Sequence, residues 1–218
     1  MLLKDVQTQP YRSLDELWTL VRDIQTSYQH SKTYTYIYWG ELDTLSHQVG
    51  PGDRQVREKW DDFVRGLEVF VRSRQGRAGR DTMLLLSADH GQIPTEIQED
   101  YDLRNHPDLV SHLVMLPSGE GRLPFLFVKP GHVGKVAASL ARKWGDQFQM
   151  APAEKVLAAG LLGSRPPCAE TVERLGRQVV FPRGNAYWWW VNKENRLHGR
   201  HGGLSREEML VPFFALEI

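Results

Sequence analysis

The part of the sequence best suited to chemistry is the pair Asp89-His90, followed at once by Gly91. The pair comes at the end of the apolar run 82–86, which predicts a buried strand of a parallel sheet. Open α/β sheets place ligand chemistry just beyond the carboxyl ends of such strands, and glycine lets the backbone turn sharply there. A carboxylate beside an imidazole is a pairing that zinc or manganese accepts, so the motif predicts metal binding. An ordinary polar turn is the alternative interpretation.

A second fragment carries Asp43 and, four residues later, His47. The preceding residues 33–39 are rich in aromatic and β-branched side chains, which predicts a strand running into Asp43. Four residues make about one helical turn, so both side chains point the same way if the segment after the strand is coiled. Asp43 and His47 are therefore a second pair of candidate ligands, and a plain surface loop is the alternative.

The third fragment is His201, which two glycines follow late in the chain. Ser205 and Glu208 then have the spacing of a capping box, which predicts a short helix starting just after the glycines. His198 is a rival ligand, but the glycines after His201 favour the latter.

Taken in order, these fragments resemble the metal-binding half of the alkaline phosphatase superfamily. Within it, the resemblance is to the type I phosphodiesterase/nucleotide pyrophosphatase branch, and it covers residues 30–115 and 196–218. Its specific parts are Asp-His-Gly after an apolar strand and the late His-Gly-Gly-Leu-Ser with a following Val-Pro. A phosphoglycerate-mutase-like phosphotransferase is similar in the first two motifs and is a second alternative, although its ending fits less well.

The resemblance implies two divalent metal ions bridged by the phosphate of a phosphate-ester or nucleotide-like small molecule. By their match to the family motifs, Asp43, His47 and His201 would hold one ion, and Asp89 and His90 part of the second. Zinc or manganese suits these oxygen and nitrogen ligands. Two such ions about 4 Å apart can clamp the attacking and leaving oxygens of an in-line displacement at phosphorus.

The catalytic nucleophile is not assigned. In the family it is a Thr or Ser of an N-terminal segment that also supplies an Asp to the second ion, and we expect this chain to lack that segment. Ser13 instead has the capping-box spacing with Glu16, and nothing around Thr44, Ser46 or Thr95 matches the family's nucleophile. We therefore expect the C-terminal metal-binding part of a two-metal phosphodiesterase, with a non-catalytic metal-binding fragment or pseudoenzyme as the alternative.

The coarse order of elements predicts an α/β fold. Helical and strand patterns alternate, which favours parallel pairing with right-handed crossovers and an incomplete alkaline-phosphatase-like core built on a parallel sheet. We expect residues 1–115 and 196–218 to form this metal-binding core and residues 116–195 to form a small α+β insert. The segments behind this prediction are helices at 13–30 and 53–74 and strands at 33–39, 82–88 and 211–217.

Three consecutive tryptophans, Trp188-Trp189-Trp190, lie inside the expected insert. In a strand, the first and third share one face. They could form a stacking platform for a nucleobase, but packing of the insert against the core is favoured because tryptophan buries a large area.

Composition sets further bounds. A chain of 218 residues with 41% hydrophobic and 25% charged residues can bury one full core. Lysine plus arginine equals aspartate plus glutamate at 27 each, so we expect no nucleic-acid partner. The single Cys168 allows no disulfide within the chain, and no run of about 18 apolar residues predicts a membrane segment. No signal-peptide core is present at the start, which favours the cytoplasm unless an upstream signal is missing; the oligomeric state is not indicated.

Overall fold

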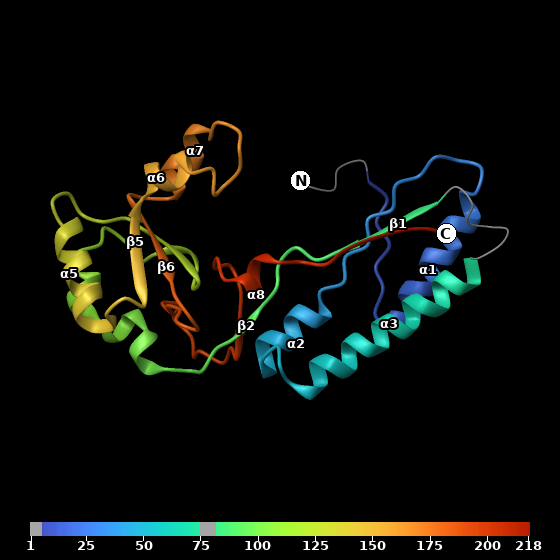
Figure 1. The fold of residues 1–218 in the computed structure, drawn as a ribbon, viewed down its shortest axis with the longest axis horizontal. Helices are drawn as coiled ribbons and strands as arrows, with labels where there is room; N and C mark the ends of the chain where they lie inside the picture. The colour runs from blue at the N-terminus through green and yellow to red at the C-terminus, as the bar shows by residue number, and fades with distance from the viewer. Residues whose placement is uncertain (1–5, 75–81) are drawn as a thin grey trace. The chain divides into compact units, whose positions relative to one another are not determined.

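Two compact units make up the chain, and each is assembled from segments far apart in the sequence (Figure 1). The computed structural model describes residues 6–74 and 82–218. Every candidate ligand belongs to unit 2. Unit 1 takes its described residues from 1–42, 54–88 and 212–218, and unit 2 consists of 43–53 and 89–211.

Two amphipathic helices, α1 (Leu14–Ser27) and α3 (Arg54–Arg74), form the core of unit 1. The ring of Trp18 on α1 stacks on that of Phe70 on α3, with centroids 5.5 Å apart, and both side chains are buried. Gly66 lets the helices approach, because a Cβ at this position would lie 2.1 Å from the ring nitrogen of Trp18. The helical segments predicted at 13–30 and 53–74 are thus confirmed by position and by packing.

The strand that leads to Asp-His-Gly is β1 (Met83–Ser87), and it pairs with β8 (Phe213–Glu217). The two strands run antiparallel, so the parallel pairing expected for β1 is wrong in the described part of the chain. The expectation of a fully buried strand is also wrong. Leu84 packs on the core of unit 1, whereas Met83 and Leu85 are 61% and 58% exposed. One face of the ribbon rests on the core, and alternate side chains face away from it.

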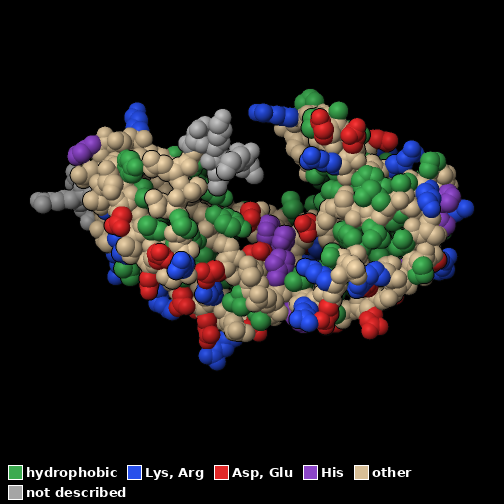
Figure 2. Space-filling view, turned by 180° about the vertical axis from the view of Figure 1, so that it is seen from behind, with side chains coloured by type: hydrophobic (Ala, Val, Ile, Leu, Met, Phe, Trp, Pro, Cys, Tyr) green, Lys and Arg blue, Asp and Glu red, His purple; other side chains and the backbone are tan. Residues whose placement is uncertain are grey.

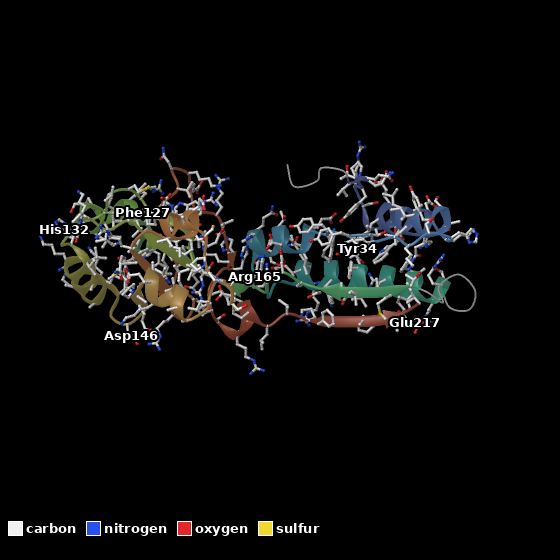
Figure 3. The ribbon with its side chains drawn as sticks, turned by 90° about the horizontal axis from the view of Figure 1, so that it is seen from above. Tyr34, Phe127, His132, Asp146, Arg165 and Glu217 are labelled. Carbon is white, nitrogen blue, oxygen red and sulfur yellow. The ribbon has the colours of Figure 1, made fainter. Side chains whose placement is uncertain are left out.

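The strand expected at 33–39 does not form, although all of these residues are described. Tyr34 and Tyr36 are 88% and 74% exposed, and Figure 3 shows where Tyr34 lies. Aromatic and β-branched residues favour strands through contacts with side chains of neighbouring strands, and here the segment pairs with none. The composition of this segment was therefore not enough to make it a strand.

Unit 2 is built around a four-stranded sheet with the order β3-β4-β6-β5, in which every pair is antiparallel. Helix α5 adds Val136, Leu140 and Trp144 to the apolar core of this unit. Residues 116–195 lie wholly within unit 2, and their status as a separate insert stays a prediction. The elements are β3 (Ser118–Glu120), β4 (Leu123–Leu126), α5 (Val133–Trp144), β5 (Phe148–Pro152), α6 (Ala153–Ala158), α7 (Ala169–Arg174) and β6 (Gln178–Pro182).

The three consecutive tryptophans, Trp188 to Trp190, pack in the core of unit 2. Trp188 is 1% exposed and stacks on Phe148 with ring centroids 4.9 Å apart. Trp189 is also buried, and Trp190 packs against the same cluster. The packing interpretation is therefore confirmed, and the buried rings cannot stack on a ligand from solution.

A short antiparallel ladder between β2 (Ile93–Pro94) and β7 (Gly199–Arg200) brings distant parts of unit 2 together. This ladder aligns the residues after Asp-His-Gly with those before His201. The remaining short elements are α2 (Glu41–Val49), η1 (Glu99–Tyr101), η2 (Leu103–Asn105), α4 (Pro107–Val110) and α8 (Arg206–Met209).

The architecture is a mixed α/β fold, as predicted, with antiparallel strand pairs in place of the expected parallel ones. Across residues 6–74 and 82–218, no helix combines the length and the apolar character needed to cross a membrane. Cys168 is exposed and carries a free thiol.

Candidate metal centre

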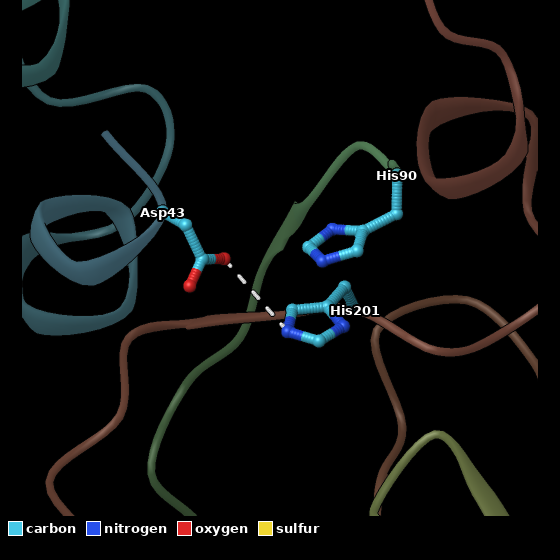
Figure 4. A group of neighbouring side chains, drawn as sticks. All are labelled: Asp43, His90 and His201. Carbon is cyan, nitrogen blue, oxygen red and sulfur yellow. Dashed lines mark ion pairs between the residues drawn. The ribbon is translucent and has the colours of Figure 1, made fainter. Parts of the chain in front are cut away.

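The three sequence motifs converge within unit 2 (Figure 4). Asp43 and His47 lie one turn apart on α2, as their spacing predicted. His90 lies in the turn before β2, and His201 directly follows β7. Because β2 pairs with β7, the two histidines are brought to the same end of the ladder, where their rings stack with centroids 3.7 Å apart.

Backbone hydrogen bonds dock α2 on this ladder. The amide of His198 donates to the carbonyl of His47 at 2.8 Å, and the amide of Thr95 donates to the carbonyl of His198 at 2.9 Å. His47 in turn places Nδ1 2.8 Å from the carbonyl oxygen of Gly199. The helix that carries Asp43 is thus tied to the strand that carries His201.

One aspartate and two histidines form the tightest group. One ligand atom each from Asp43, His90 and His201 lies within 4.8 Å of the other two, so each motif contributes one residue. Asp43 Oδ1 is 3.8 Å from His201 Nε2 and 3.5 Å from His47 Nε2. The sequence grouped His47 with Asp43 and His201, whereas the structure places His90 in the closest set and His47 beside it.

Hydrogen bonding fixes the tautomers of two imidazoles. A carbonyl oxygen can only accept, so Nδ1 of His47 must donate to Gly199. His90 makes the same contact, from its Nδ1 to the carbonyl oxygen of Gly91 at 3.0 Å. In the neutral form of either ring this tautomer leaves the lone pair on Nε2, the nitrogen of His47 that faces Asp43. Metal-ligating histidines commonly hold their other ring N–H in this way.

The surroundings of His201 favour the neutral form of its imidazole. Burial lowers its pKa below the ordinary value, the positive potential of His90 lowers it further, and the carboxylate of Asp43 opposes the shift only in part. A lowered pKa leaves the ring unprotonated at neutral pH, with a lone pair for a metal ion.

The cluster is reachable from solution. The side chains of His47, His90 and His201 are 23%, 27% and 21% exposed. Histidine side chains gather at one place on the face drawn in Figure 2. A small anionic molecule can therefore contact the imidazoles without a large rearrangement.

Asp89 is the most exposed of the five predicted ligands, with 72% of its side chain accessible. Its Oδ1 accepts from the amide of His90 at 3.2 Å, and its Oδ2 lies 3.7 Å from Nε2 of the same residue. Asp89 thus lies beside the close group, and its role as a ligand of a second ion stays a prediction.

Gln92 is a site residue that sequence reasoning missed. Its side-chain amide nitrogen lies 2.5 Å from Asp43 Oδ1 and 3.2 Å from the carbonyl oxygen of Asp43. No local pattern in the sequence marks Gln92 as a site residue, because its contact with Asp43 depends on where α2 packs.

The turn after His90 needs glycine. The amide of Gly91 donates to the carbonyl of Glu208 at 2.8 Å, and a Cβ on Gly91 would lie 2.0 Å from the carbonyl oxygen of Glu207. No side chain fits against a backbone atom at that distance. The glycine of the Asp-His-Gly motif therefore packs directly against the backbone of α8 and is hydrogen-bonded to it.

A buried ion pair supports the loop that follows His201. Arg122 donates twice to Glu208, at 3.0 Å and 2.7 Å, and both side chains are 1% exposed. Glu208 also accepts from the amide of Gly203 at 2.9 Å and from that of Ser205 at 3.4 Å. The predicted capping box at Ser205 and Glu208 is confirmed. Burial raises the pKa of Glu208, but the hydrogen bonds and charge of Arg122 outweigh it, and the net pKa is lowered.

None of the four hydroxyl residues considered as nucleophiles gains support. Ser13 caps the start of α1, with its oxygen 3.2 Å from the amide of Glu16. Ser46 and Thr95 are buried, 6% and 4% exposed. Thr44 lies on α2, next to Asp43 in the sequence.

The donor set fits a divalent transition metal. One carboxylate oxygen and two imidazole nitrogens are a mixture of ligand atoms that zinc and manganese accept. Three protein ligands with access to solution leave room for a substrate atom, as catalytic sites require.

Comparison with known proteins gives a consistent result for the fold. Residues 5–204 match the family model for type I phosphodiesterase / nucleotide pyrophosphatase. Comparison with curated proteins gives no match.

Three solved structures illustrate the likeness. Human ectonucleotide pyrophosphatase/phosphodiesterase 5 has a TM-score of 0.67 at 16% identity, over 95% of this chain and 54% of that one. An inactive form of the murine protein, in complex with AMP, has a TM-score of 0.63 at 18% identity with the same coverage. Phosphonoacetate hydrolase from Sinorhizobium meliloti 1021, in complex with phosphonoformate, has a TM-score of 0.54 at 18% identity, over 79% of this chain and 43% of that one. The chain thus spans about half the length of the structures it matches, and at these identities the likeness establishes the fold.

Proposed function

Since this chain belongs to the type I phosphodiesterase/nucleotide pyrophosphatase family, a branch of the alkaline phosphatase superfamily, we propose that it supplies the metal-binding part of a two-metal hydrolase of phosphate esters. The family is metal-dependent in general. The observation that carries the proposal is the convergence of Asp43, His90 and His201, one from each motif, with ligand atoms within 4.8 Å of one another.

In this proposal, Asp43, His47 and His201 hold one ion, and Asp89 and His90 contribute to a second. When bound, zinc or manganese ions supply Lewis acidity that stabilises negative charge on the phosphate oxygens. Asp43 brings the negative charge that offsets a cation, and the backbone carbonyls of Gly91 and Gly199 keep the bonded imidazoles in the tautomer with a free Nε2.

The proposed substrate is a nucleotide-like phosphate ester. The AMP bound to the murine relative supports this class, as does the accessibility of the histidine cluster. The formal net charge of the chain is +0, so the metal centre itself would have to attract an anionic substrate. A cytoplasmic location stays a prediction from the sequence.

A non-catalytic metal-binding role is the second candidate. It is favoured by one observation: of the hydroxyl residues considered, Ser46 and Thr95 are buried and Ser13 caps a helix. The phosphotransferase alternative has only the first two motifs in its favour.

Metal loading of the purified protein tests the proposal. The chain is stripped with a chelator and dialysed, then reloaded with zinc or manganese, and bound metal is measured by elemental analysis. His201→Ala should lower the bound metal because it removes one of three converging ligands. His198→Ala is the matched control, since that side chain is exposed and outside the cluster. Equal metal content in both variants would refute the assignment.

A further inference from the structure

A side-chain amide ties down the one carboxylate of the closest ligand group. Gln92 Nε2 lies 2.5 Å from Asp43 Oδ1 and 3.2 Å from the backbone carbonyl oxygen of Asp43. Both of these oxygens can only accept, so the NH₂ end of the amide must face Asp43. The orientation of the Gln92 side chain therefore follows from its partners.

The oxygen that Gln92 contacts is the one that faces the imidazoles. Asp43 Oδ1 is 3.5 Å from His47 Nε2 and 3.8 Å from His201 Nε2. The hydrogen bond from Gln92 fixes the rotation of the carboxylate and keeps this oxygen among the ring nitrogens. Without the amide, the carboxylate would be free to turn about its terminal bond, a torsion with a broad minimum.

Close packing also holds the amide in place. The side-chain oxygen of Gln92 is buried, and Gly199 packs against it. A Cβ on Gly199 would lie 2.6 Å from this oxygen and 2.3 Å from the carbonyl oxygen of Ser46. The carbonyl of Gly199 accepts the hydrogen bond from His47. Gln92 is therefore locked between α2 and β7, the two elements that carry Asp43 and precede His201.

We propose that Gln92 is a positioning residue whose amide aims the Asp43 carboxylate at the metal of the proposed centre. This inference rests on the proposed function, because Gln92 acts on metal binding at the proposed centre. Hydrogen-bond partners of metal ligands of this kind change metal affinity by about 10–100-fold. Gln92 touches neither substrate nor ion in this proposal, and its whole effect passes through Asp43.

A double-mutant cycle on Mn²⁺ affinity, measured by calorimetry on the purified chain, tests the inference. Gln92→Met keeps the size of the side chain and removes the donor, and we expect affinity to fall by about 10–100-fold. In the Asp43→Ala background, Gln92→Met should change affinity no further, because the group it acts through is gone. Gln98→Met, at an exposed glutamine of the same unit, is the control and should leave affinity unchanged.

The outcomes separate the two proposals. If Asp43→Ala leaves Mn²⁺ affinity unchanged, the proposed centre is wrong. If Asp43→Ala weakens binding but Gln92→Met does not, the centre stands and the role of Gln92 is overturned. An equal loss from Gln92→Met with and without Asp43 would mean a purely structural role and would also overturn it. Should Gln92→Met fail to fold by circular dichroism, Gln92→Asn, which keeps the amide but is too short to reach Oδ1, replaces it with the same expectations.

Discussion

His47 and His90 use the same ring nitrogen for the same purpose: each donates from Nδ1 to a glycine carbonyl, at 2.8 Å and 3.0 Å. The two carbonyls belong to Gly199 and Gly91, and neither of these positions has room for a side chain. A Cβ would lie 2.3 Å from a backbone oxygen at the first and 2.0 Å at the second. Glycine at these two positions therefore allows both the close packing of the backbone and the hydrogen bonds that orient the imidazoles.

Gly199→Ala should weaken the candidate centre. The added methyl group would meet the carbonyl of Ser46 at 2.3 Å, so α2 must shift away from β7. Overpacking of this kind costs about 1–3 kcal/mol, and we expect unfolding by urea at a lower midpoint and weaker Mn²⁺ binding. Gly134→Ala is the control, because no atom lies within 4 Å of a Cβ there. Equal midpoints and affinities for the two variants would contradict the argument.

The ligand motifs could be found from the sequence because each pairs residue types with a local geometry. Asp43 and His47 are one helical turn apart, and Asp89-His90 follows a strand, so both fragments carry their own evidence. Gln92 could not be assigned to the site in this way. Its importance depends on where α2 docks, which is a tertiary contact that no local pattern encodes.

Among the elements, α8 and the loop before it depend on a buried ion pair. Arg122 reaches Glu208 from the turn after β3, and both side chains are 1% exposed. The guanidinium also donates to the carbonyls of Gly184 and Ala186. Removing one partner of such a pair leaves the other charge buried, which typically costs about 3–5 kcal/mol.

Glu208→Gln should lower the free energy of unfolding at neutral pH. It should also make that free energy fall less as the pH becomes acidic. The pKa of Glu208 is lowered in the folded chain, so its contribution is fully present above the ordinary glutamate pKa, about 4.3. That contribution is lost as the pH falls through the lower folded pKa, and glutamine cannot titrate. The measurement is urea unfolding at a series of pH values between neutral and acid. Glu207→Gln, at an exposed neighbour, is the control, and an identical pH profile for both variants would count against the ion pair.

Element prediction succeeded where the signal was local and failed where it depended on partners. The caps at Ser13 and Ser205 were predicted from residues three positions apart, and both form. The apolar run at 82–86 correctly predicted a strand, but it carries no information on the direction of the neighbouring strand. The segment 33–39 has the composition of a strand but forms none in the described chain.

For the molecule as a whole, the division into two units matters most. All five predicted ligands come from the two segments that form unit 2, although His47 and His201 are far apart in sequence. The alkaline-phosphatase-like fold was predicted from three short motifs in order. This chain covers about half the length of the solved structures that it matches, 54% for the human protein. Strand direction and unit boundaries could not be derived in the same way, since they depend on contacts between distant segments.

The 218-residue chain, loaded with zinc or manganese, should hydrolyse bis(p-nitrophenyl) phosphate slowly at best. A positioned nucleophile can lower a barrier by about 7–11 kcal/mol, but Ser13 caps α1, and Ser46 and Thr95 are buried. Release of p-nitrophenol, followed by absorbance with and without chelator, is the measurement. Fast turnover that is abolished by Thr44→Ala, with Thr171→Ala as a control elsewhere in the chain, would instead identify a complete enzyme.

The hydrogen bond from His47 to Gly199 spans 152 residues of sequence. A ribosome adds about 5–20 residues per second, so α2 is made some 8–30 s before the strand that holds its imidazole. Closing so long a loop is entropically costly and slow compared with forming the helix itself. The metal centre can therefore assemble only near the end of folding of unit 2, and metal uptake during refolding should follow, not precede, the appearance of native secondary structure.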